Sequence, residues 1–395
     1  MKRTVFLMGI AAMAFASCAK DTVTEANRGM AIDFRVATQT RATEMDYEGL
    51  DEFAVTAIST TAVAAGTEGD NYFTGVTYTR GDGETFYLSD PVYYWPKEGA
   101  LNFYAYSPVT LPGTIIVTKD GKTVTDFTPA SDVSQQVDFI TATATAAHSA
   151  EIETSGVALN FSHELTQIQV KAKNSNEGYI YTVKAFKIGN VAGKGKFDFT
   201  KEHGSRWDLT STEVKSYEVE FNEVILSATA TSFLDENNSA MLLPQNLTAW
   251  TNEESGYEGT YFAVLARIET SGGTVIYPKS ADETEEDEVE GVAEGETETS
   301  EEKEFGWLAV GVDTEWVAGT KYVYTLDFST GAGTPVDPEG TGTGTGTGTG
   351  ELFGGPIKFT TTVSAWGTTD EITIEKEVTV PPVEDPTNNP AGDQQ

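Results

Sequence analysis

Few residues in this chain have the type and spacing that catalysis or metal binding would need. The three histidines, His148, His163 and His203, lie far apart and form no His-x-x-x-His pair, so each is expected to be structural or exposed and not part of a zinc site. The segment from Gly189 to Lys194 resembles a phosphate-binding loop, but it is one residue short and lacks the Ser or Thr after the lysine, which favours a turn. Carboxylates are too abundant for any catalytic pair to stand out. We therefore predict no enzyme activity, no metal site and no cofactor.

Cys18 is the one residue whose surroundings do predict chemistry. It is the only cysteine, so it cannot form an internal disulfide. It follows a basic dipeptide and an apolar run from Val5 to Ala16, the layout of a secretory signal, and the run is shorter than the ~20 residues of a membrane helix. The four residues ending at Cys18 resemble a bacterial lipobox, with Phe15 where leucine is usual. We expect residues 1–17 to be removed and Cys18 to be acylated, which anchors the chain to a membrane by lipid.

The composition is strongly acidic, with 61 Asp and Glu against 25 Lys and Arg and a formal net charge of −36. Loss of the signal would remove two basic residues and make the charge more negative still. Nucleic acid is therefore excluded as an expected partner, because phosphate backbones are bound by clustered Lys and Arg. The 395 residues suggest two domains, and 39% hydrophobic residues are enough to form real cores.

Short runs rich in Val, Ile, Thr, Tyr and Phe alternate apolar with polar residues and are separated by turn-forming residues, which is typical of β-strands. No convincing amphipathic helix longer than one or two turns is present. We predict an all-β fold of two β-sandwich domains in tandem, at residues 42–150 and 151–376. The clearest predicted strands are Ile115 to Val117, Ile168 to Val170, Tyr217 to Phe221, Tyr261 to Ile268 and Tyr322 to Phe328.

Three segments depart from the strand pattern. Residues 282–304 hold thirteen carboxylates and one lysine, so they are expected to form a solvated loop, and they lack the ordered ligand spacing of a calcium loop. Residues 340–350 alternate Gly and Thr strictly, which is typical of a flexible linker. Residues 377–395 are expected to contain the end of a last strand, followed by a disordered tail.

Five sequence blocks carry a resemblance to a known family. Together they resemble the fimbrillin (Mfa-like) family of surface proteins from anaerobic Gram-negative bacteria, over roughly residues 30 to 375, and the acidic and Gly-Thr segments are departures from it. The blocks are Thr40 to Thr43 followed by Phe53 to Ala57, then Tyr94 to Pro96 with Leu101 to Pro108, Val157 to Ile168, Met241 to Gln245, and Gly319 to Tyr324.

This resemblance implies a fold and a route to the cell surface. Family members have two transthyretin-like β-sandwich domains and travel as lipoproteins to the outer membrane. There an arginine-specific protease removes an N-terminal segment, and the subunits polymerise into a pilus, or fimbrium, by donor-strand exchange. Residues 18–41 would then be a propeptide, cut between Arg41 and Ala42, although Arg28 and Arg35 are alternative sites.

The propeptide contains a segment with strand-like alternation. Met30, Ile32, Phe34 and Val36 alternate with polar or small residues, as expected of a strand with one buried face. Cleavage would let this removable strand leave and would expose a hydrophobic groove with unpaired backbone groups, which is an unstable edge.

A second alternating segment lies near the C-terminus. Ile372, Ile374, Val378 and Val380 form a candidate donor strand, interrupted on its apolar face by Lys376. A donor of this kind could refill the groove of a neighbouring subunit, with main-chain hydrogen bonds giving affinity and side-chain pockets giving register. The alternative is that both segments pair within their own domains and never exchange.

Three functions remain open from the sequence. The first is a structural shaft subunit that assembles with other pilin subunits, identical or different, at the cell surface. The second is a tip or monomeric adhesin that binds a glycan or a host protein through its second domain. The third, a secreted hydrolase, has the least support, because a β-sandwich alone implies no chemistry.

Overall fold

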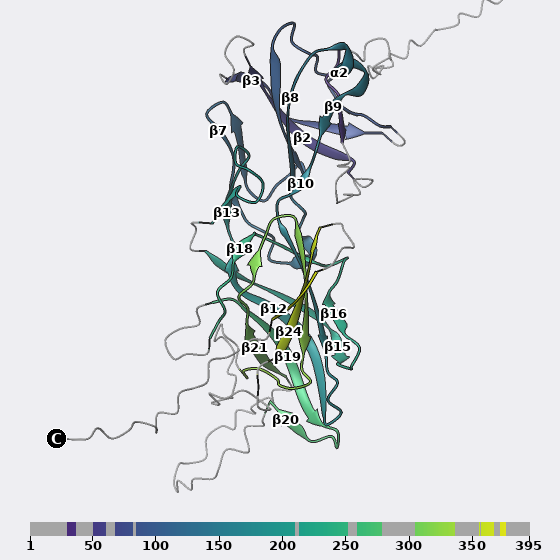
Figure 1. Ribbon diagram of the computed structural model, residues 1–395, viewed down its shortest axis with the longest axis vertical. Helices are drawn as coiled ribbons and strands as arrows, with labels where there is room; N and C mark the ends of the chain where they lie inside the picture. The colour runs from purple at the N-terminus through teal and green to yellow at the C-terminus, as the bar shows by residue number, and fades with distance from the viewer. Residues whose placement is uncertain are drawn as a thin grey trace, which may run out of the picture.

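Two groups of strands, one from each half of the chain, stack end to end along the long axis of the molecule (Figure 1). This computed structural model describes residues 30–36, 50–60, 68–81, 84–209, 213–251, 259–278, 305–335, 355, 357–366 and 372–376. Within these ranges the helical elements are the short α2 (Ala150–Ser155) and the 3-10 turn η2 (Val133–Gln135). The predicted all-β fold is confirmed.

The first group is built on an eight-stranded sheet with the order β10-β8-β5-β2-β3-β4-β1-β9. All of its neighbouring strands are antiparallel except β1 and β9, which are parallel. The strands are β1 (Phe34–Val36), β2 (Glu52–Thr60), β3 (Glu68–Arg80), β4 (Tyr87–Ser89), β5 (Ala100–Ser107), β8 (Ile140–Ala147), β9 (Val157–Leu159) and β10 (Ser162–His163). After α2 the chain returns to pair with β1 and β8, so this sheet extends to residue 163, beyond the boundary predicted at residue 150.

A four-stranded sheet with the order β14-β13-β7-β6 joins the two halves of the chain. Its strands are β6 (Thr114–Thr118), β7 (Gly121–Phe127), β13 (Gly195–Asp198) and β14 (Trp207–Asp208). The hairpin of β13 and β14 comes from the second half but pairs with β7 of the first half. Phe197 and Phe199 are buried in one cluster with Ala54 and Ile58 of β2. The halves therefore share a hydrophobic core, which burial of these rings stabilises.

The second group is a sandwich of two sheets. One sheet has the order β16-β11-β23-β24-β25 with β17 also pairing β11, and the other has the order β15-β12-β19-β20 with β21 also pairing β19. The first contains β11 (Thr166–Lys173), β16 (Thr231–Leu234), β17 (Ala240–Leu242), β23 (Thr320–Asp327), β24 (Lys358–Ala365) and β25 (Ile372–Lys376). The second contains β12 (Tyr179–Ala192), β15 (Val214–Ile225), β19 (Tyr261–Thr270), β20 (Val275–Tyr277) and β21 (Gly306–Gly311), and a separate pair is β18 (Gln245–Asn246) with β22 (Glu315–Trp316).

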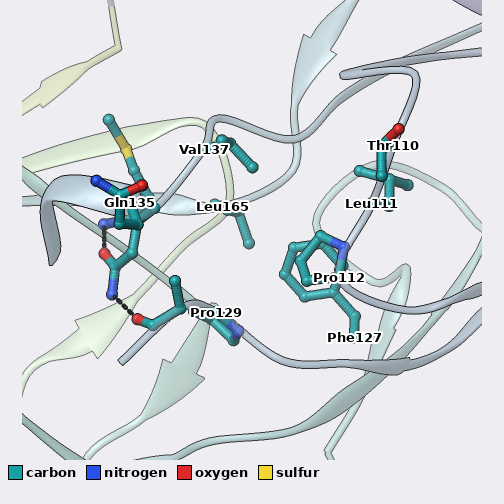
Figure 2. A pocket seen from close by; sticks show the side chains of 11 residues that line it. Thr110, Leu111, Pro112, Phe127, Pro129, Gln135, Val137 and Leu165 are labelled. Atoms are coloured by element: carbon teal, nitrogen blue, oxygen red, sulfur yellow. Dashed lines mark hydrogen bonds between the residues drawn. The ribbon is translucent and has the colours of Figure 1, made fainter. Parts of the chain in front are cut away.

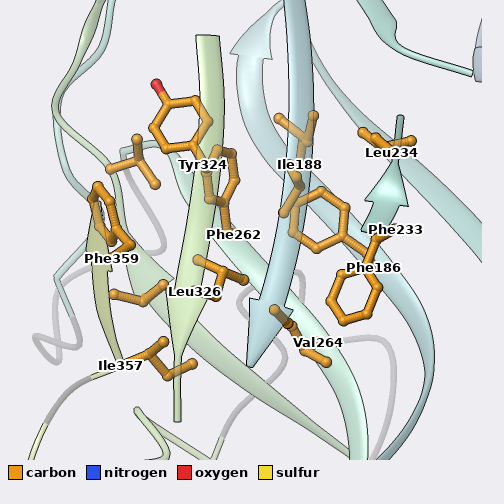
Figure 3. Packing of buried hydrophobic residues seen from close by; sticks show 14 of the residues in the cluster. Phe186, Ile188, Phe233, Leu234, Phe262, Val264, Tyr324, Leu326, Ile357 and Phe359 are labelled. Carbon is orange, nitrogen blue, oxygen red and sulfur yellow. The ribbon is translucent and has the colours of Figure 1, made fainter. Parts of the chain in front are cut away.

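The core of this sandwich lies between its two sheets (Figure 3). Phe186 of β12 and Phe262 of β19 come from one sheet, and Tyr324 of β23 and Phe359 of β24 come from the other. The rings of Phe262 and Tyr324 meet edge to face with centroids 4.8 Å apart. This geometry is favoured between aromatic rings and adds to the stabilisation from burial alone.

The strands predicted from alternation are present as β6, β11, β15, β19 and β23. The prediction of a turn from Gly189 to Lys194 was wrong for most of this segment, because β12 continues to Ala192. Gly189 lies within that strand with the Tyr261 ring close against it, so any larger side chain there would collide with the ring. Its glycine serves close packing and not phosphate binding. Residues 282–304 and 340–350 lie outside the described residues.

Candidate functional site

The removable strand predicted from the sequence occupies an interior position in the first sheet. Phe34 of β1 pairs with Tyr87 of β4 on one side and with Val157 of β9 on the other. Further toward the N-terminus, the Ile32 amide donates to the Tyr93 carbonyl at 2.8 Å. Backbone contacts on both sides therefore hold residues 31–36, and loss of this segment would leave two strand edges unpaired.

Two side chains of this segment fill the core. Ile32 and Phe34 are fully buried. The Phe34 ring lies 4.7 Å from the ring of Tyr78, 5.1 Å from that of Phe103 and 6.0 Å from that of Phe53, each in an edge-to-face arrangement. These three rings form an aromatic cage around Phe34, and without Phe34 the cage would be a hydrophobic pocket.

The remaining positions of the segment set further limits on what can occupy it. Ala31 and Asp33 are 2% and 3% exposed, Arg35 is exposed and Val36 is half-buried. Met30 departs from the predicted apolar face, because it is 51% exposed. The site thus accepts apolar side chains at positions 32 and 34, a small one at 31, and a charge at 35.

Asp33 lies on the less apolar side of the segment. Gly156, at φ +64°, stands so close that a Cβ would approach the Asp33 carboxylate to 3.0 Å. Burial raises the pKa of the nearby Tyr78 hydroxyl well above its ordinary value, and the charge of Asp33 adds to this effect. The hydroxyl therefore stays neutral at any physiological pH.

The candidate donor strand is found at an edge of the second sandwich. β25 pairs only with β24 among the described strands, with Ile372 opposite Val363 and Lys376 opposite Phe359. Ile374 lies in the same strand. Outside the described residues lie the predicted donor residues Val378 and Val380, the lipidation residue Cys18 and the cleavage pair Arg41 and Ala42.

A buried ion pair at the junction of the two halves had no signal in the sequence. The Glu164 side chain is fully buried, and its Oε1 accepts hydrogen bonds from Thr141 Oγ1 at 2.7 Å and from Arg206 Nη1 at 2.5 Å. Trp207 Nε1 donates to the Glu164 carbonyl at 2.6 Å. Burial raises the pKa of the Glu164 carboxyl, and the Arg206 charge opposes that rise. The pair ties the β13–β14 hairpin to the first sheet.

Two of the three histidines make structural contacts in this region, and the third, His148, pairs with Glu153 beside α2. His163 stacks on Trp366, with ring centroids 4.2 Å apart, and its Nδ1 lies 2.6 Å from an oxygen of Asp138. His203 Nε2 lies 3.1 Å from the His163 carbonyl. In the described part of the chain, no group of three or more His, Cys, Asp or Glu side chains could hold a metal ion.

A cavity of about 300 Å³ also lies at the junction (Figure 2). Gln136 crosses its wall, donating to the Ala130 carbonyl at 2.9 Å and accepting from the Met241 amide at 2.7 Å. No titratable side chain lines the cavity. The lining residues are Thr110, Leu111, Pro112, Phe127, Pro129, Ala130, Gln135, Gln136, Val137, Leu165 and Met241.

None of the helices among the described residues is both long and apolar enough to cross a bilayer.

Comparison with known proteins gives a family match. The family model described as Fimbrillin-like matches residues 40–347. No curated protein matches the chain.

Solved structures to which the chain is similar include a cell adhesion protein from Bacteroides ovatus, at 16% identity, covering 86% of this chain and 99% of that chain with a TM-score of 0.43. A cell adhesion protein from Parabacteroides distasonis matches at 12% identity, covering 86% and 97%, with a TM-score of 0.45. The fimbrial anchor protein Mfa2 from Porphyromonas gingivalis matches at 10% identity, covering 75% and 90%, with a TM-score of 0.32.

Proposed function

Because this chain belongs to the fimbrillin-like family, we propose that it is a structural subunit of a cell-surface pilus that polymerises by strand exchange. It is exported as a lipoprotein acylated on Cys18, and reaches the outer membrane before it is cut after Arg41. Its partners are other pilin subunits, either identical or different. No catalytic role is proposed.

The position of β1 carries this proposal. β1 ends at Val36, a few residues before Arg41, so cleavage there would detach the strand from the rest of the chain. Only hydrogen bonds and side-chain packing would then hold it, and it could dissociate. The aromatic cage around Phe34 would open to solvent, together with the free edges of β4 and β9. A donor strand from another subunit would bury both again.

The cleavage step can be tested with Arg41→Ala. We expect this variant to stay as the acylated precursor, because its first strand cannot leave. The amount of detergent-resistant oligomers, seen as a ladder on a gel, should fall at least about tenfold relative to wild type. Gel analysis of surface-shed material, with N-terminal sequencing, measures both effects. Arg28→Ala is the matched control and should assemble normally. Wild-type filaments whose subunits begin at Cys18 would contradict the proposal.

One observation favours a second function. β25 pairs with β24 along five residues of its own domain, as expected if the chain never exchanges strands. The protein would then be a tip or monomeric surface adhesin that binds a glycan or host protein. Deletion of residues 372–380 separates the two functions: filaments that still contain this chain along their length would exclude the shaft role.

A further inference from the structure

We propose that Val378 and Val380 of a second copy of this chain, and not Ile372 and Ile374, fill the Phe34 and Ile32 positions, and that the donor runs in the direction opposite to β1. This inference rests on the strand exchange proposed above. It identifies which residues of the C-terminal segment act as anchors and how they are oriented.

The argument starts from the limits that β1 places on any strand in its position. Positions 32 and 34 are fully buried among apolar groups, so a charged side chain there would lose its hydration without a partner. Position 31 holds an alanine that is 2% exposed, which excludes a long charged side chain for the same reason. Positions 34 to 36 form a strand that pairs with β9 along its length and with β4 at Phe34, so a proline inside it would remove a ladder hydrogen bond.

Ile372 and Ile374 fail these limits in both directions. Entering in the direction of β1, they bring Glu371 to position 31, and in the opposite direction they bring Glu375 there. A shift by two residues puts Lys376 into one of the two apolar positions. Each register therefore buries an unpaired charge. Ile372 and Ile374 also already belong to β25, so their exchange would break its pairing with β24.

Val378 and Val380 satisfy the limits in one direction only. In the direction of β1 they bring Glu377 to the buried position 31 and prolines to positions 35 and 36. In the opposite direction Glu377 takes the exposed position 35 and Thr379 takes the polar position 33. Pro381 then lies at position 31, where it brings no charge and ends the strand.

Lys376 acquires a role in this register. It falls at position 36, where the native Val36 is half-buried, and taking this place breaks only its pairing with Phe359 at the end of β25. A lysine can cover apolar surface there with its alkyl stem while its ammonium group stays in water. Lys376 interrupts the apolar face of the donor, and it is therefore compatible with this register but not with one that places it at a buried position.

A second copy is the occupant because β25 ends far from the β1 position of its own chain. β11 begins at Thr166 beside the junction and ends at Lys173 at the opposite end of its sheet. Lys376 pairs with Phe359 near that opposite end. The eight residues of β11 span about 26 Å. Val378 follows Lys376 by two residues, which extend about 7 Å. The segment therefore cannot return to its own first sheet.

Disulfide trapping in filaments of the full chain tests the register. Arg35 lies opposite Ala158 of β9, so Glu377 should take that place in the filament. We expect Ala158→Cys combined with Glu377→Cys to give reducible cross-links between subunits. Two comparison pairs report registers in the direction of β1: Ala158→Cys with Glu375→Cys for Ile372 and Ile374, and Tyr94→Cys with Glu377→Cys for Val378 and Val380. Cross-links through either comparison pair would overturn the inference.

A second measurement does not depend on cysteines. Val378→Ser with Val380→Ser should reduce the detergent-resistant ladder by about tenfold or more, because two buried apolar contacts are lost. Val383→Ser, outside the six positions, is the matched control and should leave the ladder unchanged. A normal ladder in the double variant would overturn the inference while strand exchange stands. Absence of a ladder in the wild type would instead reject the proposed function itself.

Discussion

Replacement of Phe34 by alanine is expected to lower the unfolding free energy of the full-length precursor by about 3–5 kcal/mol. The ring is fully buried and contacts Phe53, Tyr78 and Phe103, so its removal leaves a cavity between three rigid rings. Assembled filaments should nevertheless keep wild-type stability. If the strand that carries residue 34 is removed on maturation, mature wild-type and variant subunits have the same sequence.

Phe53→Ala is the matched control for this prediction. Phe53 is equally buried and packs in the same core, but it lies in β2, which remains in the subunit after cleavage at Arg41. It should destabilise both the precursor and the filament. Urea unfolding of the purified precursor and heat dissociation of filaments measure the two states separately. Filaments of the Phe34 variant that dissociate as readily as those of the Phe53 variant would show that the first strand stays in place.

Alternation along the chain was sufficient to predict this strand but not its surroundings. Ile32 and Phe34 lie on the buried face because side chains of a strand point to opposite sides in turn. Met30 is exposed because regular pairing has ended there: Ala31 makes only an isolated bridge with Tyr94. The cage around Phe34 comes from strands far apart in sequence. Its composition depends on which strands become neighbours, and alternation within one strand carries no such information.

The junction shows the same limit more strongly. A hairpin of residues 195–208 crosses from the second half of the chain to the sheet of β6 and β7, so a division at one point of the sequence could not describe it. Glu164 and Arg206 are 42 positions apart and look like two more surface charges among many. Their pairing follows from the crossing, which brings the hairpin beside the first sheet. Alternation of apolar and polar residues predicts where the strands lie. Which charged side chains become buried depends on which strands pair, and these are often far apart in sequence.

Arg206→Met should therefore have a large effect, although arginine is usually a surface residue. The substitution keeps much of the side-chain volume but removes the only cation that hydrogen-bonds the Glu164 carboxylate within the described structure. Thr141 Oγ1 would remain as a single donor to it. An unpaired buried charge of this kind typically costs about 3–5 kcal/mol of unfolding free energy. The double variant with Glu164→Gln should recover much of that loss, because the buried group is then neutral.

The loss should also depend on pH, in a direction that identifies its cause. Burial already raises the pKa of Glu164 in the folded protein, and without the opposing charge of Arg206 it should rise further. A carboxyl with a raised folded pKa binds more protons folded than unfolded. Unfolding free energy then falls as pH increases from the unfolded value, about 4.3, through the folded one.

The Arg206→Met deficit is consequently expected to be small near pH 5 and to grow toward pH 8, when it is measured against the double variant by urea unfolding. Both variants lack the guanidinium, so the comparison isolates ionisation of Glu164. A difference between the two variants that stays constant across this range would show that ionisation of Glu164 is not its cause. Packing lost with the Arg206 guanidinium, which lies 5.9 Å from the Phe197 ring centroid, would affect both variants equally. A deficit that grows with pH would instead show that neutralising the buried Glu164 carboxylate stabilises the junction, in addition to the pairing of β13 with β7 and the shared hydrophobic core.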